Sequence, residues 1–201
     1  KLTTKNVFHT FFFIGGDRMN SVEPIRGKNT INKFAQVLRS YSERDYVLFL
    51  TGIYLGRRIS DILPLKMKDV KDREYVYFRE SKKNKEAYLK INKKLKKVFK
   101  DYCADMDGED YLFAPLKGSR DRHITRQQYW NILNRAASQI GYRDKIGCHS
   151  LRKTLGHELY SSGVDITMIM LVFNQDDVNY TKRYIGVTAD EINNALEKLS
   201  L

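Results

Sequence analysis

The sequence SERDYVLFLTGIYLGRRISDIL, residues 42–63, joins a strongly apolar segment to two consecutive arginines. Ser42 and Asp45 have the spacing of a capping box, in which side chains satisfy free N–H groups of the first helical turn. The pattern therefore predicts an apolar helix that begins at this box. It also predicts a shorter helix over residues 58–63, which ends because Pro64 cannot continue a helix. The two arginines thus lie at the junction of two predicted helices.

Helices are predicted over most of the remaining chain, and one β-hairpin interrupts them. Residues 74–79 are rich in aromatic and β-branched side chains, and residues 87–91 alternate between apolar and polar ones. A lysine-rich, turn-forming segment separates them, so together they predict a hairpin with lysines at its tip. The fold class is therefore predicted to be α+β, mostly α-helical, with a small antiparallel sheet. Before the hairpin, a helix is predicted with its cap at Asn29 or Thr30 and with Ile31, Phe34, Val37 and Leu38 on its apolar face. After the hairpin, the pattern predicts a helix from a cap at Asn92 to Met106, a short strand over 111–113, and helices over 125–141, 150–161, 165–173 and 180–185. A last helix is predicted from Thr188, with Ile192, Leu196 and Leu199 on one face.

The composition limits the class of protein. With 201 residues, 42% of them hydrophobic and 30% charged, the chain has the size of one domain with a full core. Its longest unbroken apolar run, residues 168–173, is far shorter than the roughly 20 residues of a membrane-spanning helix. Two cysteines without C-x-x-C spacing exclude a disulfide scaffold and a cysteine-rich zinc site. These features predict a cytoplasmic protein without a membrane partner.

The charge of the chain is large and unevenly placed. Thirty-six Lys and Arg against 24 Asp and Glu leave a net charge of +12. Residues 79–100 hold ten basic and two acidic side chains, whereas residues 101–110 hold five acidic ones and no basic one. Charge of this sign favours a polyanionic partner such as DNA, RNA or an anionic membrane surface. The basic block is therefore predicted to face nucleic acid, with a merely solvated surface as the alternative.

Common motifs for metals and nucleotides are absent from the sequence. It contains no G-x-x-x-x-G-K-[ST] loop, no G-x-G-x-x-G and no H-E-x-x-H. Its four histidines do not have metal-ligand spacing. Cys148 lies beside His149, but sequence neighbours rarely point at each other, so a buried structural cysteine is the better interpretation. No metal and no cofactor are predicted.

Basic residues and one tyrosine occur in a recognisable order along the chain. Residues 56–61, GRRISD, follow the apolar helix; Lys82 lies in the hairpin turn; His149-Ser-Leu-Arg152 begins a helix; and Tyr184 lies in a short helix. This order resembles the catalytic domain of the tyrosine recombinases, which are phage-type integrases and site-specific recombinases. The family pattern is Arg, a hairpin Lys, His-x-x-Arg, His or Trp, and a nucleophilic Tyr. The resemblance implies that family's helical-bundle catalytic domain and its strand-exchange activity.

The chemistry of these residues agrees with DNA cleavage. Breaking a phosphodiester without a metal requires donors for the non-bridging oxygens, and an arginine can bind two oxygens at once. Arg58 and Arg152 are the candidates. A tyrosine phenolate, here that of Tyr184, can form a covalent phosphate ester and later be expelled. By resemblance, His149 assists proton transfer and Lys82 protonates the departing 5′-hydroxyl.

Two of these assignments have alternatives among sequence neighbours. Arg57 could take the place of Arg58, although the register of Gly-x-Arg-Ile-Ser-Asp favours Arg58. Lys83 or Lys85 could take the place of Lys82, because all three lysines belong to the same turn.

Two further polar residues are predicted near the site. Asp61 either orients catalytic groups or is an exposed helix residue. Gln175 stands nine residues before Tyr184, where the family usually has His. Glutamine donates a hydrogen bond to a phosphate oxygen but neither carries charge nor shuttles a proton. Because some family members have Trp there, we expect a weakened rather than an abolished active site.

The resemblance covers about residues 25–192 and implies an organisation for the protein. Residues 1–24 are interpreted as a lead-in or linker and residues 25–201 as the catalytic domain, with an N-terminal core-binding domain missing from this fragment. The expected partners are double-stranded DNA, further copies in a homo-tetramer on that DNA, and an accessory DNA-bending or excision factor. A prokaryotic or phage-encoded protein of the cytoplasm, associated with the nucleoid, is expected.

The predicted function is site-specific recombination, in which DNA strands are cleaved and rejoined through a 3′-phosphotyrosine intermediate. A type IB topoisomerase-like enzyme would use the same chemistry but reseal the original strand. A catalytically weakened or inactive DNA-binding module of the same fold would bind in a salt-sensitive manner and form no covalent product. A basic RNA-binding domain has less support, because no RNP-like strand pair or Gly-x-x-Gly loop is evident.

Overall fold

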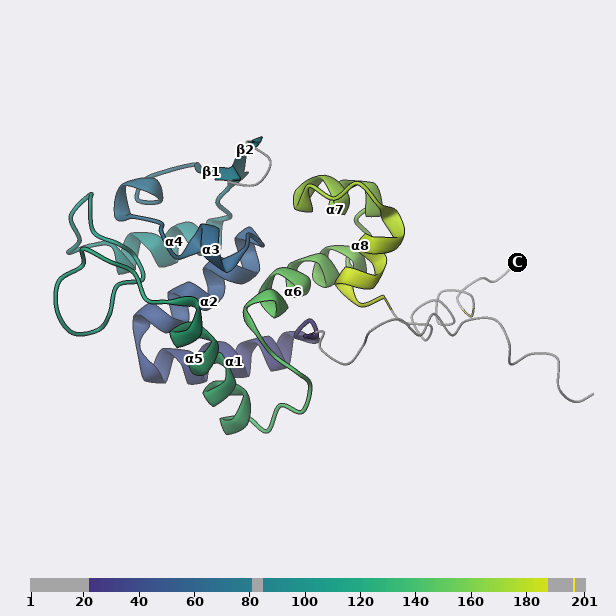
Figure 1. The fold of residues 1–201 in the computed structure, drawn as a ribbon, viewed down its shortest axis with the longest axis horizontal. Helices are drawn as coiled ribbons and strands as arrows, with labels where there is room; N and C mark the ends of the chain where they lie inside the picture. Colours follow the sequence, from purple (N-terminus) through teal and green to yellow (C-terminus); the bar gives the residue numbers. More distant parts are fainter. Residues whose placement is uncertain (1–21, 81–84, 188–196, 198–201) are drawn as a thin grey trace, which may run out of the picture.

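The computed structural model describes residues 22–80 and 85–187, with residue 197 beyond them. These residues form a helical body with one two-stranded antiparallel sheet (Figure 1), so the predicted mostly α-helical architecture with a hairpin is confirmed. The elements in chain order are α1 (Lys28–Tyr41), α2 (Glu43–Leu55), α3 (Ile59–Ile62), η1 (Met67–Asp69), β1 (Tyr75–Glu80), β2 (Lys85–Lys90), α4 (Lys93–Tyr102), α5 (Arg126–Gln139), α6 (Cys148–Ser161), α7 (Ile166–Phe173) and α8 (Val178–Ile185).

Helix α2 lies at the centre of the main hydrophobic core and packs against α1, α4 and α6. It is buried nearly all around, which explains its almost uniformly apolar sequence. As predicted, the Ser42 side chain accepts the Asp45 N–H at 3.1 Å. The Asp45 carboxylate instead pairs with Arg44, whose Nη2 donates to it at 2.7 Å. Only half of the predicted capping box is therefore formed, and the two arginines directly follow the cap residue Gly56 at the carboxyl end of the helix.

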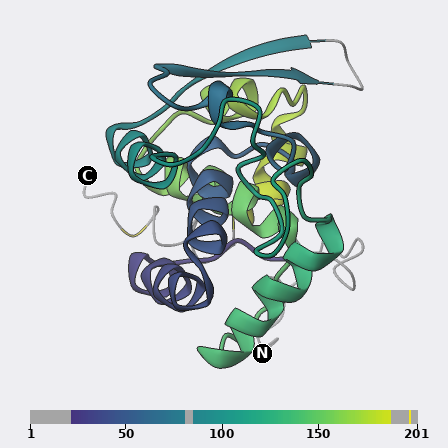
Figure 2. The same cartoon turned by 90° about the vertical axis from the view of Figure 1, so that its left-hand side faces the viewer.

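The hairpin pairs β1 with β2 in antiparallel register, with Tyr77 opposite Tyr88. Val76 and Phe78 point into the core, whereas Tyr77 and Tyr88 are exposed and their rings lie 5.1 Å apart. Figure 2 shows the two strands side by side across one end of the helical body. The turn between them, which contains Lys82, lies outside the described residues.

A second, smaller hydrophobic cluster holds α7 and α8 against α6. Ile169, Phe173 and Ile185 are its fully buried members. The packing is close because Gly156 of α6 has no side chain; a Cβ there would lie 2.4 Å from Ile185 Cγ2 and 2.6 Å from Phe173 Cε2. Figure 1 shows α7 and α8 beside α6 at the end of the molecule away from α5. Helix α6 thus connects the main core to this smaller cluster.

The predicted strand over 111–113 is wrong. Tyr111 forms an isolated bridge with Lys66, and the Leu112 N–H donates to the Leu65 carbonyl at 3.0 Å. Leu112 and Phe113 are fully buried in the core. Their apolar character therefore reflects packing of a loop and not the pairing of a strand.

Several helix ends also differ from the prediction. Helix α6 begins two residues early because the Ser150 hydroxyl accepts the Gly147 N–H at 3.1 Å from inside the first turn. Helix α8 begins two residues early because the Asp177 side chain accepts the Tyr180 N–H at 3.0 Å. Helix α1 begins at Lys28 after Gly27, without a side-chain cap from Asn29 or Thr30, and α4 ends at Tyr102 rather than at Met106. The predicted helix from Thr188, with Ile192, Leu196 and Leu199, lies outside the described residues.

Within the described ranges, no helix has the length and apolar character needed to cross a bilayer.

Candidate active site

Arg152 is held rigidly in the interior at the start of α6. Its side chain is buried, and its two terminal nitrogens donate to the carbonyls of Gly56 at 2.7 Å and Phe173 at 2.8 Å. The guanidinium also lies over the Phe173 ring, 4.5 Å from the ring centre. Burial lowers the pKa of Arg152, and the phenol of Tyr184 opposes that effect. Arg152 therefore links the end of α2, the end of α7 and the residue predicted as the nucleophile.

Tyr184 lies on α8 in a half-buried aromatic environment. Its ring packs edge-on against Phe173 at 5.8 Å and stacks with Tyr180 at 5.9 Å between ring centres. Burial raises the pKa of the Tyr184 phenol, while the charge and hydrogen bonding of Arg152 and the charge of Arg58 lower it. The phenol is therefore protonated near neutral pH, and the cations around it act to stabilise its anion.

The side chains of Arg57 and Arg58, which follow α2, have different surroundings. Arg57 is buried, and its guanidinium lies 5.8 Å from the centre of the Phe78 ring in β1. Arg58 is exposed at the start of α3, and its charge lowers the pKa of both His149 and Tyr184. The geometry therefore favours Arg58 over Arg57 as the residue available to a phosphate.

His149 is the second residue of α6 and is half-buried. Burial lowers its pKa, and the positive charges of Arg126, Arg152, Arg58 and Lys153 lower it further. The imidazole is thus neutral at neutral pH, which is the form that can accept a proton.

The lowered pKa of His149 predicts a pH dependence of stability. The unfolded chain takes up the proton near pH 6.5 and the folded chain only at lower pH, so the unfolded state binds more protons in between. We expect the free energy of unfolding to fall as pH decreases from about 7 to 5, and this fall to be smaller in His149→Gln. Urea denaturation at a series of pH values measures it; equal pH slopes in the two proteins would contradict the assignment.

Gln175 lies in the short connection between α7 and α8. Its side-chain oxygen accepts the Thr181 hydroxyl at 2.8 Å, and its backbone N–H donates to the Met170 carbonyl at 2.9 Å. The carbonyl that binds Arg152 belongs to Phe173, two residues earlier. Gln175 thus lies two residues beyond the carbonyl that binds Arg152, and its amide nitrogen is the donor that it can offer to a ligand.

Two cations at the site had no role in the sequence prediction. The Lys153 ammonium lies 5.4 Å from the centre of the Tyr184 ring and donates to the Val22 carbonyl at 2.8 Å. Arg126, the first residue of α5, is the charged residue that lowers the pKa of His149 most, after the effect of burial. Consecutive helix residues point about 100° apart, so the position of Lys153 after Arg152 did not indicate that both would reach Tyr184.

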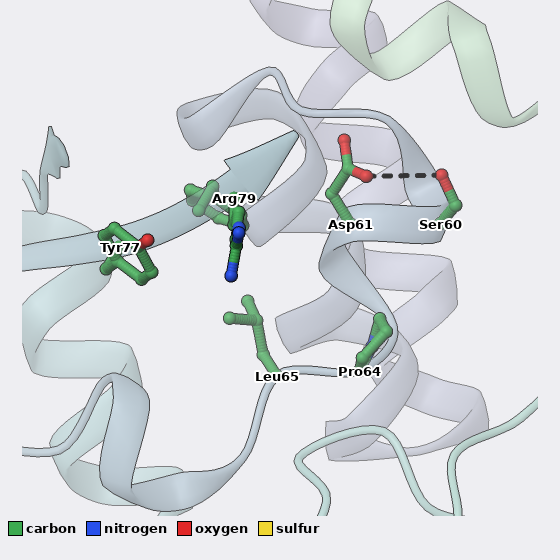
Figure 3. Close-up of a pocket in the computed structure, with 7 residues that line it drawn as sticks. Ser60, Asp61, Pro64, Leu65, Tyr77 and Arg79 are labelled. Carbon is green, nitrogen blue, oxygen red and sulfur yellow. Dashed lines mark hydrogen bonds between the residues drawn. The ribbon is translucent and has the colours of Figure 1, made fainter. Parts of the chain in front are cut away.

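A shallow pocket of about 260 Å³ lies where α3 faces the hairpin (Figure 3). Ser60 and Asp61 line it from α3, and Tyr77 and Arg79 line it from β1. The Ser60 hydroxyl donates to the Asp61 carboxylate at 3.5 Å. Asp61 is therefore a partly exposed residue at the boundary between the hairpin and the helix that Arg58 begins.

A predominantly helical domain that gathers two arginines, a neutral histidine and a tyrosine defines a class of DNA strand-breaking and rejoining enzymes. The chain belongs to the phage integrase family, whose model matches residues 27–191. It is 38% identical over 172 residues to the probable integrase/recombinase YoeC of Bacillus subtilis, covering 86% of this chain and 93% of YoeC. The predicted family, fold class and tyrosine-type recombinase function are confirmed.

Solved structures agree on the fold. The crystal structure of XerA recombinase superposes with a TM-score of 0.73 at 18% identity, covering 90% of this chain and 67% of that one. The Tn1549 transposon integrase, solved in complex with a circular intermediate DNA, superposes with a TM-score of 0.68 at 15% identity, covering 91% and 68%. The chain spans only 62% of the XerA recombinase of Thermococcus onnurineus and 60% of that of Pyrococcus furiosus, which it matches in sequence.

Proposed function

We propose that Tyr184 is the nucleophile of a DNA strand-exchange reaction and that Arg58 and Arg152 bind the scissile phosphate. The observation that carries the proposal is the position of Tyr184. Its half-buried phenol is next to Arg152, and both arginines lower its pKa against the effect of burial. Guanidinium groups that favour a phenolate also favour the negative charge that builds on the phosphate oxygens in the transition state.

The reaction exchanges one phosphate ester for another. The Tyr184 oxygen forms a bond to phosphorus, the bond from phosphorus to the 5′-oxygen breaks, and a 3′-phosphotyrosine remains. The phenolic proton passes to His149, which is neutral at neutral pH because burial and nearby cations lower its pKa. Lys82, which lies outside the described residues, donates a proton to the departing 5′-oxygen. A 5′-hydroxyl of a second duplex then reverses these steps, so the bond energy is conserved and no cofactor is required.

Gln175 has a hydrogen-bonding role in this proposal. Thr181 holds its side-chain oxygen at 2.8 Å, which orients the amide. The amide nitrogen then donates to a phosphate oxygen, without the charge that a histidine would bring. This geometry supports a site that is weaker than one with histidine and still competent.

Double-stranded DNA is the proposed substrate. The net charge of +12 supports this substrate, as does the likeness to an integrase solved with DNA. Helix α4 adds four exposed lysines, Lys93, Lys94, Lys97 and Lys100. We also propose a homo-tetramer on the DNA, an accessory DNA-bending or excision factor, and a place on the nucleoid in the cytoplasm. Residues 25–201 form the catalytic domain in this proposal, and residues 1–24 are its lead-in.

Trapping the covalent intermediate tests the proposed function. The probe is a nicked suicide substrate made from the junctions of the DNA element that encodes the protein, because loss of the short fragment prevents religation. We expect a denaturation-resistant adduct, and a tryptic peptide with a nucleotide on Tyr184 by mass spectrometry. Binding of this DNA without an adduct, even in Gln175→His, would overturn the catalytic assignment and leave a DNA-binding module.

A further inference from the structure

Residues 22–26, here called the tether, run across α6 and reach the end of α8. The Lys153 ammonium donates to the Val22 carbonyl at 2.8 Å, and the Ile25 N–H donates to the Thr154 hydroxyl at 2.8 Å. Ile25 itself is fully buried in the main core. The tether is therefore attached to α6 directly beside Arg152.

The last residue of the tether holds the carboxyl end of the helix that carries Tyr184. Arg26 donates from its Nη2 to the carbonyl of Gly186, the residue that ends α8, at 3.0 Å. A positive charge at a helix carboxyl end binds its last carbonyls and interacts favourably with its dipole. The Arg26 Nη2 also lies 3.5 Å from Glu23 Oε2, and this ion pair orients the guanidinium from within the tether.

Two features of Gly186 allow the hydrogen bond from Arg26 to form. Its φ of +75° lies in the left-handed region that favours glycine. A Cβ at this position would also lie 2.8 Å from the Arg26 Nη2 and 3.3 Å from Pro24 Cγ. The chain therefore leaves room at the end of α8 for the side chains of the tether, 160 residues away in sequence.

The position of α8 explains why such a contact matters. Helix α8 belongs to the small cluster with Ile169, Phe173 and Ile185, which is separate from the main core. Ile25 is anchored in the main core and Arg26 binds α8, so the tether bridges the two clusters. Tyr184 precedes Gly186 by two residues, and a shift of the last turn of α8 moves its phenol relative to Arg152.

We infer that Arg26 is a positioning residue that aligns Tyr184 with Arg152 through the end of α8. The inference rests on the proposed role of Tyr184 as nucleophile. Arg26 touches neither the phosphate nor the reacting atoms in this scheme, and it acts by fixing the last turn of the helix. Misplacement of a reacting group by about 1 Å can cost about 100-fold in rate.

The test separates the rate of cleavage from the amount of active protein. Single-turnover cleavage of the nicked suicide substrate gives a rate constant and an amplitude, and titration gives the DNA dissociation constant. For Arg26→Met, which keeps the apolar stem and removes the donors, we expect a rate constant about 10- to 100-fold lower. The amplitude and the DNA affinity should stay close to wild type. Arg26→Lys retains a positively charged donor nitrogen and should recover part of the rate.

Arg39→Met is the matched control, because Arg39 is an exposed arginine of α1 that pairs with Glu43 far along the chain from α8. A wild-type rate constant in Arg26→Met would overturn the inference. So would a lower amplitude and melting temperature with an unchanged rate constant, since that result would mean a purely structural role. No adduct in the wild-type protein would instead overturn the proposed function, and this inference with it.

Discussion

Tyr184→Phe is expected to lose covalent adduct formation by at least about 10⁴-fold, because the variant keeps the ring and removes the only atom that can bond to phosphorus. The ring contacts with Phe173 and Tyr180 do not depend on the hydroxyl. Loss of one hydrogen bond to Arg152 should reduce the free energy of unfolding by only about 1 kcal/mol. Adduct formation on the suicide substrate and thermal unfolding measure the two effects separately.

Tyr180→Phe is the control for this prediction. Tyr180 stacks on Tyr184 and lies one turn earlier on the same helix, but half of its side chain is exposed. We expect this variant to form the adduct at a rate near that of the wild type. If the adduct persisted in Tyr184→Phe and disappeared in Tyr180→Phe, the nucleophile would be Tyr180.

Arg152→Lys is expected to reduce the cleavage rate constant by about 10²- to 10³-fold, the loss typical of removing a transition-state donor. It should also destabilise the fold. The guanidinium binds the Gly56 and Phe173 carbonyls at the same time, and the single ammonium of lysine cannot span both in that geometry. A buried carbonyl left without its donor costs about 1–3 kcal/mol. Single-turnover cleavage and urea denaturation are the two measurements.

Arg44→Lys separates the catalytic effect from the structural one. Arg44 is also buried, and it donates to the Ala114 carbonyl at 3.0 Å and to Asp45, but it belongs to the amino end of α2. We expect a comparable loss of stability and an unchanged rate constant for the molecules that remain folded. A similar decrease of the rate constant in both variants would mean that Arg152 acts only through the fold.

Some contacts within one helical turn were predicted from the sequence, but the starts of α1, α6 and α8 were not. The Thr125 and Gln128 side chains form the predicted capping box at the start of α5, and Asn92 caps α4 as expected. Each of these bonds joins residues three apart, so the local pattern contains all the information that they need. Prediction also failed where distant segments decide, as in the buried loop that contains Leu112.

The candidate site was likewise only partly predictable from the sequence. The order of Arg58, His149, Arg152 and Tyr184 is visible in the sequence, because the chemistry of phosphate transfer restricts the residue types. The register of Gly-x-Arg-Ile-Ser-Asp favoured Arg58 over Arg57. The structure supports that choice, because the Arg57 guanidinium lies against Phe78 of β1.

The amino-acid sequence was sufficient to predict the family, the mostly helical fold and the ordered set of candidate site residues. The side chains that surround this set became visible in the folded chain, including Lys153 beside the Tyr184 ring and Arg26 at the end of α8. The difference lies in the range of the interactions. Helix periodicity and capping act over a few residues, whereas the direction of a buried guanidinium depends on carbonyls from segments that meet only when the chain is folded.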